Sequence, residues 1–285
     1  MKRYVFITLK VLLICMLVYS VFRLASLGAG LVRDRQQFEQ LSAAAEQTAL
    51  YETETGEVHH DSMDTEMYDA VQPDTGMNSQ TAEENKSSIG KSKTVNTGKF
   101  QDLIRSNRDF YGWIRIEGTP VDYPVMWTPD EPDYYLHHDF YGKESKSGVP
   151  YIGKNCSPDC DNTILYAHNM KNGTMFAALL NYADENYYRK HPTIVFDTIE
   201  QDGLYDIIAV FREKVHYSDE TGVFRYYNYC GELDKEQFDE YVDRIKEISF
   251  YDTGITAAYG QKLLTLSTCS YHTENGRFVV VAVKR

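Results

Sequence analysis

The stretch LLTLSTCSYHTENGRFVVV, from Leu263 to Val281, contains two apolar runs typical of buried β-strands, separated by a polar loop. The first run ends at Cys269, and Arg277 begins the second run eight positions later. If the loop joins neighbouring strands, the thiol and the guanidinium lie at the same end of one sheet. A strand cysteine is most often a buried structural thiol. However, an arginine beside it would favour the thiolate and could hydrogen-bond an oxyanion, which makes the pair a candidate nucleophile and charge stabiliser.

Similar short runs, rich in Val, Ile, Tyr and Phe and bounded by Gly, Pro, Asp and Asn, recur through residues 99–285. They predict an all-β barrel or sandwich. The eight strands are expected at residues 112–116, 121–128, 148–153, 162–169, 193–198, 204–215, 262–269 and 277–285.

Two helical insertions interrupt this β pattern, at residues 174–191 and 233–250. In the second insertion the apolar residues recur at helical spacing, and Asp234 with Gln237 forms a potential capping box. Its apolar face consists of Phe238, Tyr241, Val242, Ile245 and Ile248.

The N-terminus, residues 1–24, carries an apolar segment interrupted by Lys10, whose aliphatic stem would let its charge reach the headgroups. We interpret it as a retained membrane anchor. A cleaved signal peptide is the alternative, because small residues follow Leu24. Residues 25–50 are rich in Ala, Gln, Glu and Leu and predict a membrane-proximal helix.

Residues 51–98 are acidic and poor in large apolar side chains, which predicts a disordered spacer ahead of a folded domain at 99–285. Such a spacer would let that domain stand away from the membrane. The bulk of the chain is expected outside the cell.

The composition narrows the range of functions. A net charge of −13 argues against a nucleic-acid partner, because no basic stripe is available to neutralise phosphates. The five cysteines are too few for a small disulfide scaffold, so a thiol can remain free for chemistry. Cys156 and Cys160 in CSPDC lack the further ligands of a zinc site, which leaves a loop disulfide or two unused thiols. No metal or cofactor is expected.

A cysteine enzyme also needs a proton carrier. His168 ends the apolar strand NTILYAHN, just where the run becomes polar. His272 lies three residues from Cys269 and is the alternative, although a position in the loop predicts exposure to solvent. We therefore select His168, Cys269 and Arg277 as the candidate set.

Four segments together resemble the sortase family, the membrane-anchored transpeptidases of Gram-positive bacteria. TLSTC with an arginine eight residues on resembles the family signature. YYLHHDFYGKESKSGVPYI, LYAHNMKNGTMFAALLNY and the helix LDKEQFDEYVDRIKEI are similar to segments of class B sortases. The resemblance covers about residues 100–285.

The resemblance implies a closed eight-stranded sortase barrel with inserted helices and a catalytic triad of His168, Cys269 and Arg277. It also implies a substrate contact for Ser267. The implied reaction cleaves a C-terminal sorting signal after Thr through a thioester, then transfers the secreted protein to an amine of the cell-wall precursor or of a pilin. The implied location is the cell membrane, crossed once, with the catalytic domain outside.

Two alternative functions remain open from the sequence. One is a hydrolytic, wall-associated cysteine peptidase, although such enzymes place the cysteine before the histidine, at a helix N-terminus. The other is a non-catalytic, membrane-anchored binding domain.

Overall fold

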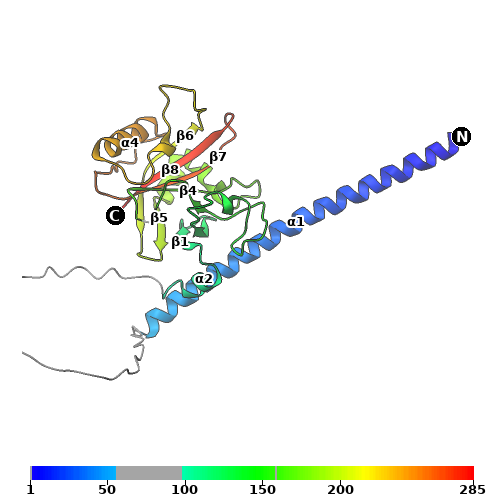
Figure 1. The fold of residues 1–285 in the computed structure, drawn as a ribbon, viewed down its shortest axis with the longest axis horizontal. Coiled ribbons are helices and arrows are strands. Elements are labelled where there is room, and N and C mark those ends of the chain that lie inside the picture. The colour runs from blue at the N-terminus through cyan, green and yellow to red at the C-terminus, as the bar shows by residue number, and fades with distance from the viewer. Residues whose placement is uncertain (1, 56–97, 158) are drawn as a thin grey trace, which may run out of the picture.

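The computed structural model describes residues 2–55, 98–157 and 159–285 (Figure 1). A single helix, α1 (Lys2–Thr55), runs from the N-terminus past one side of the folded domain. By length and composition, α1 contains a candidate membrane span within Leu12–Ala45, and the large apolar side chains from Leu12 to Phe22 are exposed. The predicted membrane-proximal helix is thus part of one continuous helix with the apolar segment. Most of the predicted spacer, residues 56–97, lies outside the described residues.

The folded domain is a closed eight-stranded barrel, as the family resemblance implies, whereas the strand pattern alone left a sandwich open. Around the barrel the strand order is β1-β2-β3-β4-β7-β8-β6-β5. The strands are β1 (Phe110–Arg115), β2 (Asp122–Met126), β3 (Tyr151–Ile152), β4 (Asn162–Tyr166), β5 (Thr193–Thr198), β6 (Leu204–Lys214), β7 (Leu263–Cys269) and β8 (Gly276–Lys284).

Short helices occupy the connections between the strands. The first insertion forms η2 (Phe176–Ala183) and α3 (Glu185–Lys190), and the second forms α4 (Lys235–Ile248). The capping box at Asp234 and Gln237 is present in both directions, as predicted. The remaining helices are α2 (Gln101–Ser106), η1 (Tyr134–Leu136) and η3 (Tyr226–Asn228).

Burial on both faces explains why β7 and β8 are apolar without alternation. Successive side chains of a strand point to opposite faces, so a strand that is buried on one face only would alternate between apolar and polar residues. Leu264 and Val280 belong to the barrel interior, whereas Leu263 and Val281 pack outside it with Ile245 of α4. The helix therefore covers the outer face of the strands that carry Cys269 and Arg277.

Helix α1 also packs against the barrel, a contact that the sequence does not predict. Phe38 stacks edge-on against Tyr123 of β2, with ring centroids 5.2 Å apart. Nearby, Ser42 donates a hydrogen bond of 2.6 Å to Asp122. Together with Leu41 and Ala45, Phe38 joins the main hydrophobic core of the domain. The folded domain thus lies against the membrane-proximal helix.

Candidate active site

Cys269 and Arg277 face each other across the antiparallel pair β7–β8, as paired residues of the register. Between them the chain reverses in a tight turn, in which Ser270 N–H donates to Gly276 O over 2.9 Å. A side chain at position 276 would bring a Cβ within 2.3 Å of Ser270 O, so the turn requires glycine there. The guanidinium of Arg277 donates to the carbonyls of Asn275 (3.3 Å) and Gly276 (3.1 Å). Strand register therefore brings thiol and guanidinium to one end of the sheet.

His168 reaches the same end of the sheet from the other side of β7. Strand β4 runs parallel to β7, with Tyr166 paired to Ser267. Beyond that pair, Thr268 Oγ1 donates to Ala167 O over 2.8 Å, and Asn169 Nδ2 donates to Cys269 O over 3.0 Å. Because parallel strands end at the same edge, His168 and Cys269 leave the barrel at one rim. The three residues selected from the sequence are thus gathered around the C-terminal end of β7.

The hydrogen bond of His168 identifies its tautomer. Its Nε2 lies 2.9 Å from the carbonyl oxygen of Leu136, and a carbonyl oxygen can only accept. Nε2 therefore carries hydrogen, and Nδ1 is the atom free to take or release a proton. Desolvation by burial lowers the pKa of His168 below 6.5, an effect that the bond to Leu136 opposes and nearby His137 reinforces. The imidazole is therefore biased toward its neutral form.

Ser267 is fully buried, and its hydroxyl hydrogen-bonds to the hydroxyl of Tyr226 over 2.8 Å. Burial raises the pKa of Tyr226 to about 12, while the Ser267 bond and the charge of Arg277 act in the opposite direction. Tyr226 also interacts electrostatically with Cys269. A substrate contact by Ser267 remains a prediction, and the tyrosine beside it is a residue that sequence reasoning missed.

Tyr151 of β3 is a second tyrosine near the thiol. Burial and the carboxylate of Asp133 raise its pKa, and both Arg277 and Cys269 contribute smaller electrostatic effects. The sequence gives no signal for either phenol, because tyrosines are abundant throughout the chain. Only the folded barrel shows which of these tyrosines lie near Cys269 and Arg277.

His272, the alternative histidine, lies in the turn between β7 and β8. It is exposed, and its Nδ1 lies 2.9 Å from the hydroxyl of Ser270. This placement agrees with the predicted loop position.

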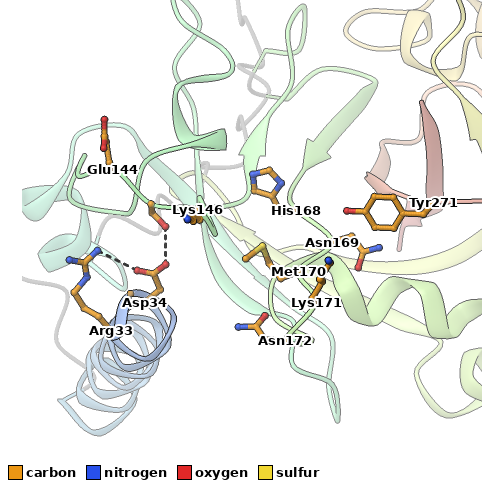
Figure 2. Close-up of a pocket in the computed structure, with 12 residues that line it drawn as sticks. Arg33, Asp34, Glu144, Lys146, His168, Asn169, Met170, Lys171, Asn172 and Tyr271 are labelled. Carbon is orange, nitrogen blue, oxygen red and sulfur yellow. Dashed lines mark hydrogen bonds and ion pairs between the residues drawn. The ribbon is translucent and has the colours of Figure 1, made fainter. Parts of the chain in front are cut away.

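A cavity of about 530 Å³ opens beside His168 (Figure 2). Its walls come from α1 at Gly30, Arg33 and Asp34, from residues 144–146, from residues 168–172, and from Tyr271. Asp34 of α1 accepts a hydrogen bond of 2.9 Å from Ser145, which closes one side of the cavity. Within the described residues, no group of three or more His, Cys, Asp or Glu side chains is arranged to hold a metal ion.

Comparison with known proteins gives a consistent result. A family model described as the Sortase domain matches residues 114–285. Sortase B of Listeria monocytogenes is 32% identical over 186 residues, which cover 64% of this chain and 72% of that protein. Sortase B of Staphylococcus aureus is 30% identical over 191 residues, covering 65% of this chain and 73% of that protein.

Solved structures of similar proteins share the barrel. The Staphylococcus aureus sortase B–substrate complex aligns with a TM-score of 0.58 at 26% identity, covering 67% of this chain and 86% of that one. A mutant form of Clostridium perfringens sortase B aligns with a TM-score of 0.59 at 28% identity, covering 67% and 88% respectively.

Proposed function

This chain belongs to the sortase family, as a class B sortase and cysteine transpeptidase, and we propose that Cys269, His168 and Arg277 carry its reaction. The donor in this proposal is a secreted protein with a C-terminal sorting signal, cleaved after a Thr. The acceptor is an amine of the cell-wall precursor or of a pilin. The apolar part of α1 would anchor the enzyme in the cell membrane, with the barrel outside.

In the first half of the reaction, the thiol of Cys269 gives its proton to Nδ1 of the neutral His168 imidazole, and the sulfur attacks the carbonyl carbon of the Thr residue in the signal. Negative charge develops on the carbonyl oxygen, and the guanidinium of Arg277 hydrogen-bonds to it. The C–N bond then breaks, and the departing amine takes a proton from His168. The product of this half is a thioester between Cys269 and the donor protein.

In the second half, the acceptor amine attacks the thioester carbonyl. His168 takes a proton from the attacking nitrogen, the C–S bond breaks, and His168 returns the proton to the released sulfur of Cys269. The tautomer in the structure favours Nδ1 as the proton-carrying atom in both halves, because Nε2 is engaged by Leu136. The new amide bond joins the donor protein to the acceptor.

The observation that carries this proposal is the register pair of Cys269 and Arg277 at the strand end where the β4 strand delivers His168. A thiol at the strand end that also carries an arginine on the paired strand and a half-buried imidazole on the parallel strand suits acyl transfer better than a structural role. The order of the residues in the chain, with His before Cys, and the position of the cysteine on a strand also separate this site from papain-like peptidases.

Product analysis tests the proposal. The full-length enzyme is incubated with Thr-containing sorting peptides and an excess of hydroxylamine as a small amine nucleophile. We expect the acyl fragment to appear as its hydroxamate, with loss of activity in Cys269→Ala and His168→Ala and retention in His272→Ala. Release of the free acid alone would indicate a hydrolase. Activity in Cys269→Ala would contradict the proposed nucleophile, and selective loss in His272→Ala would contradict the proposed histidine.

A further inference from the structure

Three cysteines outside the active site lie around the connection between β3 and β4. Cys160 donates to Asn162 O over 3.3 Å, and Cys156 approaches the same oxygen at 3.9 Å. The segment after Cys230 reaches this point as well, because Gly231 N–H donates to Asn162 O over 3.1 Å. Cys230 itself approaches Lys154 O, two residues before Cys156, at 3.6 Å. Two connections that are distant in sequence therefore bring their thiols together.

The contacts among the thiols have Cys156 at their centre. Its thiol is coupled electrostatically to the thiols of both Cys160 and Cys230. The interaction with Cys156 lowers the pKa of Cys160 and of Cys230, and it raises the pKa of Cys156. The two outer thiols therefore ionise more readily than Cys156, and thiolates are the reactive species in disulfide exchange.

Accessibility differs among the three. Cys156 and Cys160 are buried, with 7% and 2% of their surface exposed, whereas Cys230 is only partly buried. A reagent from solvent therefore meets Cys230 first.

We propose that Cys156, Cys160 and Cys230 form a disulfide centre, in which oxidation by a small-molecule disulfide links Cys156 to Cys230. This linkage differs from the loop disulfide between Cys156 and Cys160 that the CSPDC spacing alone suggests. It ties the β3–β4 connection to the β6–α4 connection. The centre is independent of the transpeptidation chemistry assigned to Cys269.

The oxidation proceeds by two exchanges. The thiolate of Cys230 attacks one sulfur of the small disulfide RSSR, forming a mixed disulfide and releasing one thiolate, RS⁻. The sulfur of Cys156, after losing its proton to the released thiolate or to Cys160, attacks the Cys230 sulfur and expels the second RS⁻. Two protein thiols are oxidised and one RSSR is reduced to two RSH, so electrons and protons balance.

The link would strengthen a region that supports the nucleophile strand. Asn162 is fully buried, and its side chain bonds to Tyr229 O and accepts from Thr265 Oγ1 of β7. Cross-linking Cys156 to Cys230 fixes the two segments around this asparagine and closes a long loop of the unfolded chain. We expect oxidation to raise Tm by roughly 10 °C, the order of effect for a long-loop disulfide in a domain of this size.

Peptide mapping by mass spectrometry tests the proposal on the full chain in detergent. The protein is treated with oxidised glutathione, and its remaining thiols are then blocked. We expect a peptide pair joined through Cys156 and Cys230 in the wild type and in Cys160→Ser, with none in Cys156→Ser. The Tm gain should persist in Cys160→Ser and disappear when a phosphine reductant is added.

Two results would overturn the proposal. One is three free thiols after oxidation, and the other is a product joined only through Cys156 and Cys160. The wild-type map decides the pairing even if a variant fails to fold. Labelling of Cys269 by a thiol-directed sulfonate reagent shows whether each variant has kept its barrel.

Discussion

At the scale of single residues, the role proposed for Arg277 depends on how its guanidinium is held. Strand register places Arg277 opposite Cys269, and its guanidinium is oriented by the hydrogen bonds that it donates to the carbonyls of Asn275 and Gly276. A group fixed before the reaction begins needs little reorganisation when charge develops on the substrate oxygen. This is why the guanidinium should matter more to turnover than to folding.

Replacement of Arg277 tests this role. Arg277→Ala should lower kcat/KM for a sorting peptide by roughly 10²–10³, the usual scale for losing an oxyanion donor. Arg277→Lys is the matched control, since it keeps the charge and loses the planar fork of donors. Its kcat/KM should therefore fall between those of the wild type and Arg277→Ala. Steady-state kinetics on the folded variants measures both effects, and wild-type turnover by Arg277→Ala would refute the assignment.

The lowered pKa of His168 predicts a pH dependence of stability. Because burial disfavours the imidazolium, the unfolded chain binds more protons than the folded one near this group's titration range. The folded state should therefore lose stability as pH falls below about 6.5, the ordinary pKa of histidine, with the loss complete below the lowered pKa of the folded state. At higher pH the penalty is absent.

Denaturant unfolding between pH 7.5 and 5 measures this loss. His168→Gln removes the titrating group, so the loss of stability on acidification should be smaller in the variant than in the wild type. The exposed His272→Gln serves as a control and should retain most of the wild-type slope. Identical slopes in wild type and His168→Gln would contradict the buried, neutral histidine.

Sequence reasoning located the candidate triad because each member stands where an apolar run meets polar residues, a signal that belongs to the residue's own strand. It could not find Leu136 as the partner of His168, or Tyr226 as the partner of Ser267. Those contacts depend on how distant connections fold back over the rim. Neither spacing nor composition encodes that information.

At the scale of elements, α4 is a feature that the sequence does predict. Helical periodicity predicts its apolar face, and the spacing of Asp234 and Gln237 predicts its capping box. In the structure that face packs against the outer side of β6, β7 and β8. Tyr241 of α4 hydrogen-bonds Thr265 of β7 over 3.0 Å, on the strand that leads to Cys269. The helix is thus linked to the strand that carries Cys269, and we infer that it supports one wall of a groove in which the sorting peptide would bind.

Ile245→Asp tests that inference. The substitution places a charge among apolar neighbours at a cost of several kcal/mol, which should loosen the wall while the barrel remains folded. We expect KM for the sorting peptide to rise, with Cys269 still reactive toward a small thiol reagent. Asp243→Ala, at an exposed position of the same helix, should leave both properties unchanged. Unchanged peptide kinetics in folded Ile245→Asp would make the helix a scaffold unrelated to the groove.

At the scale of the whole molecule, α1 is both the candidate anchor and a wall of the cavity beside His168. The sequence predicted a helix here but not its docking, because the contact residues Phe38, Leu41 and Ala45 form a short apolar face within an otherwise polar stretch. With a rise of about 1.5 Å per residue, Arg33 lies roughly 13 Å along the helix from Leu24. The docked helix would therefore hold this rim of the barrel close to the membrane surface, in contrast to the expectation that the spacer lets the domain stand away from it.

Phe38→Ala tests the docking. Removing a buried aromatic ring from this contact should destabilise it by about 3 kcal/mol and speed amide exchange in residues 34–45. The reactivity of Cys269 should stay unchanged, because the ring packs on Tyr123 of β2, a strand that carries none of the three candidate residues. Glu39→Ala is the control, since it removes only an exposed ion pair with Arg35. Exchange rates in Phe38→Ala equal to those of the wild type would show that the contact does not hold the helix.

The most direct test of the whole account is the identification of the covalent intermediate. The full-length enzyme is quenched in acid during turnover of a Thr-containing sorting peptide, and intact mass and peptide mapping locate the acyl group. The account predicts one acyl fragment ending in Thr, attached to Cys269 through a bond that neutral hydroxylamine cleaves, and absent from Cys269→Ala. Peptide turnover with the acyl group on another residue, or turnover that persists in Cys269→Ala, would contradict it.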